Sequence, residues 1–190
     1  MNLFLIGYRG SGKTTVAEQL GVLLEWPWVD ADEELERRAG KSIQQIFSES
    51  GEGAFRDLES AIVAELAQRN NHVIALGGGA VLREQNLTAL QGRGKMIFLR
   101  AKAETLHERI IADPTTDARR PNLTSSGGLE EIRELLAART PIYERCAGLT
   151  IDTDGLSPAE IARDIIAALA PEDLGPEDMS TETSGRGDSA

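Results

Sequence analysis

Cysteine, aromatic residues and positive charge are all scarce in this sequence. Among 190 residues there is one cysteine, Cys146, and aromatic side chains make up 4%. A single cysteine excludes a disulfide within the chain and fits a reducing compartment. With so few rings, the core must be filled by aliphatic side chains. The formal net charge of −11 argues against a nucleic-acid-binding face and against binding to an anionic membrane.

Long apolar runs are also missing. No run approaches the roughly 18 residues of a membrane-spanning helix. The first residues lack the basic region of an export signal. We therefore expect a soluble, cytoplasmic protein with no membrane and no nucleic-acid partner. A chain of this length is sufficient for one domain with a substantial core.

The most informative stretch is residues 7–14, Gly-Tyr-Arg-Gly-Ser-Gly-Lys-Thr. It fits the phosphate-binding pattern G-x-x-x-x-G-K-[ST] at every fixed position. The glycines allow a tight turn whose backbone N–H groups reach phosphate oxygens. Lys13 brings a positive charge to the β- and γ-phosphates, and the Thr14 hydroxyl is placed to bind Mg²⁺. The helix that begins inside the motif adds the positive end of its dipole.

The residues on either side of this motif provide the context that it requires. Residues 2–6 are a short apolar run typical of a buried strand, and residues 14–24 have apolar positions at helical spacing. The motif requires strand, loop and helix in this order. The alternative is a glycine-rich turn that binds nothing, which would leave this agreement unexplained.

Short apolar strands alternate with amphipathic helices along the rest of the chain. Strands are expected at residues 2–6, 28–30, 72–76, 95–99 and 149–152. Helices are expected at residues 14–24, 31–40, 42–48, 54–69, 82–90, 103–112, 129–138, 142–146 and 158–169. Gly51 and Gly53 should break the chain, and Pro141 should break or restart a helix. The alternation predicts an α/β fold with a parallel sheet covered on both faces.

Three further segments carry specific expectations. The helix at 54–69 should bury one stripe of apolar residues, namely Phe55, Leu58, Ile62 and Leu66. Residues 113–127 are rich in Asp, Pro, Thr, Ser and Gly, which is typical of a loop. Residues 171–190 lack any apolar period, and we expect them to form a disordered acidic tail.

Two groups of residues follow the predicted strands. Asp30 and Asp32 come at the end of the second strand, and ligands of open parallel sheets bind at the carboxyl ends of strands. Two carboxylates there could hold Mg²⁺ through water and accept a proton from a hydroxyl, or they could simply cap the next helix. Residues 77–79 are three glycines after the third strand, which suggests a close approach to the backbone or a plain turn.

Several arginines are candidates for binding anions in this acidic chain, because the planar guanidinium suits carboxylate and phosphate. For each of them the alternative is a solvated surface charge. Two lie in the 113–127 loop, and a loop that brings arginine over a phosphate site is typical of a lid. The candidates are Arg56, Arg109, Arg119, Arg120 and Arg139.

Taken together, the motifs resemble those of the shikimate kinase family. The similar pieces are the loop L-I-G-Y-R-G-S-G-K-T-T, D-A-D at 30–32, F-R-D-L-E at 55–59, G-G-G-A-V at 77–81, R-P-N-L at 120–123 and R-T-P-I-Y at 139–143. They extend over residues 2 to about 165. The loop motif is common to many nucleotide-binding proteins, whereas the other motifs in this order are far more specific.

The resemblance implies a fold and an activity. The fold would be a three-layer α/β/α P-loop kinase fold whose five-stranded parallel sheet has the order 2-3-1-4-5. Residues 1–170 would be a single domain, with a substrate-binding segment at about 31–60 and a lid at about 112–125. The activity would be ATP-dependent phosphorylation of the shikimate 3-hydroxyl, giving shikimate 3-phosphate and ADP in the pathway to chorismate and aromatic amino acids. The partners would be the small-molecule substrates ATP and shikimate, and we expect the protein to act as a monomer.

The resemblance also implies residue roles. ATP would be bound by Gly10, Ser11, Gly12, Lys13, Thr14, Thr15, Arg109 and Arg120, with Arg109 against the adenine. Shikimate would be bound by Asp32, Arg56, Gly77, Gly78, Gly79 and Arg139, with both arginines on its carboxylate. Mg²⁺ would be held by Thr14 directly and by Asp30 through water. Asp32, Lys13 and Arg120 would be the catalytic residues, with Asp32 as the base near the 3-hydroxyl.

Two departures and two alternative functions remain open. The lid has Asn122 where leucine is common in the family, and residues 152–155 lack an arginine that some members place against adenine. The first alternative is a related kinase for a sugar acid such as gluconate or for a nucleoside monophosphate. The second is a ligand-binding module of the same fold without catalysis.

Overall fold

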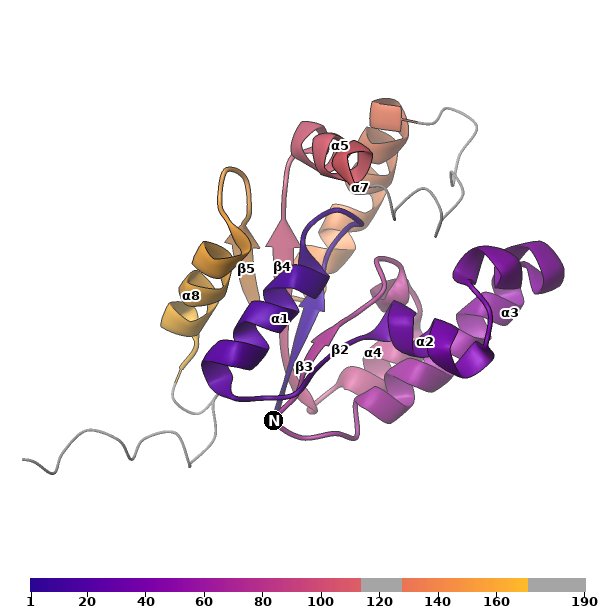
Figure 1. The fold of residues 1–190 in the computed structure, drawn as a ribbon, viewed down its shortest axis with the longest axis horizontal. Helices are drawn as coiled ribbons and strands as arrows, with labels where there is room; N and C mark the ends of the chain where they lie inside the picture. Colours follow the sequence, from indigo (N-terminus) through magenta and orange to yellow (C-terminus); the bar gives the residue numbers. More distant parts are fainter. Residues whose placement is uncertain (114–127, 171–190) are drawn as a thin grey trace, which may run out of the picture.

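The computed structural model describes residues 1–113 and 128–170 (Figure 1). Along the chain, the elements are β1 Asn2–Ile6, α1 Lys13–Leu24, β2 Trp28–Asp30, α2 Ala31–Ala39, α3 Ile43–Leu66, β3 Val73–Ala75, the 3₁₀ helix η1 Ala80–Leu82, α4 Glu84–Leu90, β4 Gly94–Arg100, α5 Ala103–Ala112, α7 Gly128–Cys146, β5 Leu149–Asp152 and α8 Pro158–Ala168.

The five strands form one parallel sheet with the order β2-β3-β1-β4-β5, as the resemblance implied. In its register Asp30 of β2 pairs with Ala75 of β3, and Leu5 of β1 pairs with the same Ala75. The carboxyl ends of β1, β2 and β3 therefore meet at one edge. In parallel sheets this edge is where ligands bind.

Both faces of the sheet are covered by helices, and the central strand β1, apolar except for Asn2, is buried along its whole length. Successive side chains of a strand point to opposite faces. Leu3 and Leu5 pack with apolar residues of α1 and α8, whereas Phe4 and Ile6 pack with those of α2, α3 and α7. Figure 1 shows α1 and α8 together beside the sheet, with α2 and α3 grouped away from them. The expected three-layer α/β/α fold is confirmed.

Two predicted helix breaks differ from the structure. Gly51 does break the helical geometry, with φ 80° and ψ 173°, but the helix resumes at once and α3 continues past Gly53 to Leu66. The break predicted at Pro141 is wrong, because α7 runs through that residue. Buried side chains on either side of the proline, Ile132 and Tyr143, hold α7 against the core, and this packing outweighs the lost backbone hydrogen bond.

The predicted apolar stripe of α3 is wrong at one position. Leu58 is 42% exposed, whereas the next residue, Glu59, is 3% exposed and lies among the buried residues of the helix. A charged side chain that takes a core position needs a partner of opposite charge. That partner belongs to the site described below. Among the described residues, no helix is both long enough and apolar enough to cross a membrane.

The contact between β1 and β4 predicts a large difference between two glycine substitutions. A Cβ at Gly94 would lie 2.1 Å from the backbone oxygen of Asn2, and no side chain can move to relieve that clash. We expect Gly94→Ala to lower the free energy of unfolding by ~2 kcal/mol or more. The matched control is Gly53→Ala in α3, where a Cβ meets nothing within 4 Å. It should raise stability by ~0.5–1 kcal/mol. Urea unfolding measures both, and equal changes would contradict the packing of these strands.

Candidate active site

The phosphate-binding loop joins β1 to α1, and its glycines cannot be replaced without rearrangement. Gly7 has φ 142° and Gly10 has φ 77°, which side chains rarely adopt. A Cβ at Gly7 would lie 2.7 Å from the Leu99 backbone oxygen, and one at Gly10 would lie 2.9 Å from Ile110 Cγ1. The loop is therefore pressed against β4 and α5. This contact shapes the turn that precedes the N-terminus of α1, which attracts anions.

Lys13 lies over this loop. Its Nζ donates hydrogen bonds to the backbone oxygens of Gly7 and Tyr8, both at 2.9 Å. Thr15 donates from its hydroxyl to the Gly12 oxygen at 3.0 Å. The ammonium group thus stands at the centre of the turn, where the pattern requires a cation for phosphate.

Asp30 has two partners at the start of α2. Its Oδ1 accepts from the backbone N–H groups of Asp32 and Glu33, at 2.9 and 3.3 Å, so it caps α2. Its Oδ2 accepts from the Thr14 hydroxyl at 2.5 Å. The capping alternative is therefore correct for Asp30 but incomplete, because the other oxygen faces the phosphate loop.

The Thr14–Asp30 pair fits Mg²⁺. Hydroxyl and carboxylate oxygens are hard ligands, and Mg²⁺ commonly takes one or two protein oxygens together with phosphates and waters. Residues 1–113 and 128–170 hold no cluster of three or more His, Cys, Asp or Glu side chains for a metal, and such a site does not need one. Thr14 and Asp30 are the residues that could hold the ion.

The three glycines after β3 make room for charged side chains. A Cβ at Gly77 would lie 2.8 Å from both Asp32 Oδ1 and Glu59 Oε1, and one at Gly79 would lie 2.6 Å from Arg56 Nη1. The expectation of a close approach is therefore met by this chain's own side chains. A plain turn would not need three glycines in a row.

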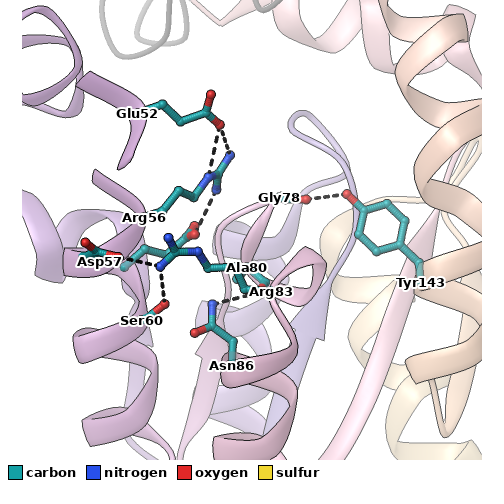
Figure 2. Close-up of polar contacts among 10 residues, drawn as sticks. Glu52, Arg56, Asp57, Ser60, Gly78, Ala80, Arg83, Asn86 and Tyr143 are labelled. Atoms are coloured by element: carbon teal, nitrogen blue, oxygen red, sulfur yellow. Dashed lines mark hydrogen bonds and ion pairs between the residues drawn. The ribbon is translucent and has the colours of Figure 1, made fainter. Parts of the chain in front are cut away.

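Arg56 and Glu59 form a largely buried ion pair on successive turns of α3. Arg56 Nη1 donates to Glu59 Oε2 at 2.8 Å, and the side chains are 16% and 4% exposed. Burial alone would lower the pKa of Arg56, but the carboxylates of Glu59 and Glu52 raise it above its usual value. Figure 2 shows Arg56 bonded to Glu52 on one side of the glycine loop and Tyr143 bonded to Gly78 on the other.

Glu59 was not among the predicted site residues. The sequence signal was present, because an acidic residue three positions after Arg56 interrupts the apolar stripe of a helix. Helical periodicity assigns such a residue to the solvent side, so the prediction chose Leu58 instead. The position of Arg56 over the glycine loop makes burial of Glu59 favourable.

Helix α7 contributes Tyr143 and Arg139, and it lies on the side of the glycine loop opposite to α3 (Figure 2). The Tyr143 hydroxyl donates to the Gly78 backbone oxygen at 2.5 Å, and Tyr143 is fully buried. The Arg139 guanidinium carbon lies 5.8 Å from the centre of the Tyr8 ring, over its face. Within the part of the chain that the structure describes, Arg139 has no carboxylate partner at ion-pair distance.

Arg109 of α5 lies at the edge of the site next to the residue that follows β5, Thr153. Its Nη1 donates to the Thr153 hydroxyl at 3.0 Å and its Nη2 to the Thr153 backbone oxygen at 2.6 Å. Residues 152–155 thus hold Arg109 in place, although they bring no arginine of their own.

One cavity of about 320 Å³ brings most of the predicted residues together. Its lining includes Gly10, Gly12, Lys13, Thr14, Thr15, Asp30, Asp32, Gly78 and Arg109, together with the unpredicted Arg9, Glu36 and Asp113. Arg56, Gly77, Gly79 and Arg139 are not in this lining, although Gly77 closely approaches Asp32, which is. Ser11 is buried rather than in the lining. Arg119 and Arg120 lie outside the described residues.

The fold and the site together define a class. A parallel sheet ordered 2-3-1-4-5, with a phosphate-binding loop after β1 and an acidic helix start after β2, is that of the P-loop kinases of small molecules. The family model described as shikimate kinase matches residues 9–170. The chain belongs to the shikimate kinase family.

Individual relatives agree with this assignment. A shikimate kinase of Rhodopirellula baltica is 41% identical over 179 residues, covering 94% of this chain and 95% of that protein. Among solved structures, shikimate kinase from Acinetobacter baumannii in complex with shikimate has a TM-score of 0.81 and 35% identity, covering 87% of this chain and 90% of that one. A gluconokinase from Sinorhizobium meliloti has a TM-score of 0.54 and 18% identity, which shows a common fold alone.

The two partners of Asp30 predict different results for two substitutions. Asp30→Ala removes the cap of α2 and should lower the free energy of unfolding by ~1 kcal/mol. Asp30→Asn keeps an oxygen that can accept from the Asp32 and Glu33 N–H groups and should stay within ~0.5 kcal/mol of wild type. Urea unfolding without ligands measures both variants. Equal losses would show that the negative charge, rather than the cap, stabilises this region.

Proposed function

We propose that this protein transfers the γ-phosphate of ATP to the 3-hydroxyl of shikimate, giving shikimate 3-phosphate and ADP in the pathway to chorismate and aromatic amino acids. One observation carries the proposal. Asp32 and Arg56 converge on the glycine loop beside the phosphate-binding loop. A carboxylate and a guanidinium placed together suit an acceptor that has both a hydroxyl and a carboxylate.

On the nucleotide side, the phosphate loop and Lys13 bind the phosphates of ATP, and Arg109 lies against the adenine. The ammonium of Lys13 exchanges its bonds to the loop carbonyls for phosphate oxygens. Thr14 and Asp30 would hold Mg²⁺, Asp30 through water, and the bound ion would supply positive charge against the phosphates.

On the acceptor side, Asp32 accepts the proton of the 3-hydroxyl, and Arg56 and Arg139 bind the carboxylate. Arg56 is supported by its raised pKa and by Glu59, which keep the guanidinium charged and in place. Arg139 is supported by its position over Tyr8 without a carboxylate partner among residues 1–113 and 128–170. Gly77, Gly78 and Gly79 keep side chains out of the space that the acceptor needs.

Phosphoryl transfer passes through a loose transition state, so the protein acts mainly by positioning groups and by neutralising charge. Arg120, within a lid at about 112–125, would add a third positive charge on the transferred phosphate, and closure of the lid would exclude water. This role, a single domain over residues 1–170 and a tail at 171–190 stay predictions, since most of the lid and all of the tail lie outside the described residues. A monomeric state, a cytoplasmic location and the absence of a nucleic-acid partner also stay predictions.

A second candidate function is phosphorylation of another acceptor, since a gluconokinase has the same fold. A coupled ADP-release assay with ATP and Mg²⁺ distinguishes the candidates, with shikimate, gluconate, AMP and no acceptor in parallel. We expect ADP only with shikimate. ADP with another acceptor would keep the fold but remove the roles of Arg56 and Arg139. ATP binding without ADP would favour a ligand-binding module.

Asp32 gives the sharpest prediction for this function. Asp32→Asn keeps the size of the side chain but removes the proton acceptor, so the kcat for shikimate should fall by a factor of ~10² or more, while ATP binding remains. Asp57→Asn in α3, whose side chain is 77% exposed, is the matched control. Stopped-time ADP assays and titration with a fluorescent ATP analogue measure the two properties. Normal turnover by Asp32→Asn would remove Asp32 as the base.

A further inference from the structure

A second cluster of charged side chains lies between the phosphate loop and α7. It contains Tyr8 and Arg9 of the loop together with Glu131 and Arg139 of α7. The proposed chemistry does not use Glu131, although its side chain is 0% exposed. Burying a carboxylate is unfavourable unless positive charge lies close to it. Its burial at this position therefore needs a reason.

Two cations share the ring of Tyr8. The guanidinium carbons of Arg9 and Arg139 lie 5.9 and 5.8 Å from the ring centre. Each guanidinium is attracted to the face of an aromatic ring, but two like charges on one ring repel each other. Arg9 Nη2 lies 3.4 Å from Glu131 Oε1, and the Arg9 side chain is only 14% exposed.

The negative charge that balances this pair does not come from the ring. Burial raises the pKa of the Tyr8 hydroxyl above its usual value, although Arg9 and Arg139 oppose the rise, so the phenol is neutral at neutral pH. Glu131 is the carboxylate that contacts this cluster. It therefore offsets the repulsion between Arg9 and Arg139.

We propose that Glu131 is a positioning residue for the acceptor. By holding Arg9, Glu131 lets Arg139 stay over the Tyr8 ring, where the Arg139 guanidinium is available to the substrate carboxylate. This inference rests on the proposed function, because it takes Arg139 as a carboxylate-binding residue. Glu131 itself touches no substrate. It connects the nucleotide loop with the helix that carries the acceptor arginine.

This arrangement predicts how loss of the Glu131 charge changes the KM for shikimate. In Glu131→Gln two guanidiniums remain on one ring without a buried anion. The new glutamine could still accept a hydrogen bond from Arg9, whereas Arg139 is held among the described residues by its contact with the ring, so Arg139 is the group that turns away. The KM for shikimate should rise roughly fivefold to tenfold, while kcat and the KM for ATP stay within about twofold.

A double-mutant cycle tests this explanation directly. Arg9→Met removes the cation that the structure shows at Glu131, so the buried carboxylate should attract Arg139 away from the ring and also raise the KM for shikimate. In the Arg9→Met, Glu131→Gln double variant the charges balance again, and the KM should return to within about twofold of wild type. The exposed neighbour on the same helix, Glu130→Gln, is the control for a loss of charge from α7.

The readouts separate positioning from mere stability. A KM that rises in both single variants and recovers in the double variant supports the proposal, whatever the melting temperatures do. An unchanged KM in Glu131→Gln, with only a lower melting temperature, overturns it. The proposal is also overturned if the fold increase in KM of the double variant equals the product of the fold increases of the two single variants. Absence of shikimate-dependent ADP release by the wild-type protein would overturn the proposed function, and this inference with it.

A second comparison covers the case in which Glu131→Gln does not fold. Tyr8→Phe keeps the ring on which Arg139 lies, whereas Tyr8→Leu removes it and adds no charge. The KM for shikimate should be several-fold higher in the Leu variant than in the Phe variant. Equal KM values in these two folded variants would overturn the role of the ring and, with it, the proposal.

Discussion

The acceptor half of the site depends on one constraint, which is that the backbone after β3 has no side chains. Any residue larger than glycine at positions 77 and 79 would occupy the space of Asp32, Glu59 or Arg56. Because these three side chains meet over bare backbone, the buried charge of Glu59 is balanced by Arg56 at 2.8 Å, and Asp32 remains at the cavity. The glycine loop thereby brings charges from α2 and α3 to the end of the central strands.

Helix α7 relates this loop to the phosphate loop. Near its C-terminal end Tyr143 bonds to Gly78, and one turn earlier Arg139 lies over Tyr8. Near its N-terminal end Glu131 pairs with Arg9. A single helix thus contacts both loops between which a phosphoryl group would pass. A rigid helix that contacts both loops keeps their groups at fixed relative positions. Phosphoryl transfer depends on such positioning more than on covalent chemistry by the protein.

The sequence predicts the fold well because its signals are local. Alternation of strands and helices predicts the layered α/β architecture, the phosphate-loop pattern locates the nucleotide site, and similarity of motifs supplies the strand order. The errors come from tertiary contacts. Glu59 is buried beside Arg56, which lies over the glycines, and α7 passes Pro141 because the core holds both of its halves. Asp30 caps α2 with one carboxylate oxygen and accepts a hydrogen bond from Thr14 with the other. Neither predicted alternative, a helix cap or a residue of the phosphate site, therefore describes Asp30 completely.

The proposed function requires that this site directs phosphate to one hydroxyl of a small carboxylate. Phosphorus NMR of the product formed from ATP, Mg²⁺ and shikimate can establish this, with proton coupling used to locate the ester. We expect a single phosphomonoester on the 3-hydroxyl together with ADP. An ester on another hydroxyl, or inorganic phosphate with unchanged shikimate, would contradict the placement of Asp32 and the arginines.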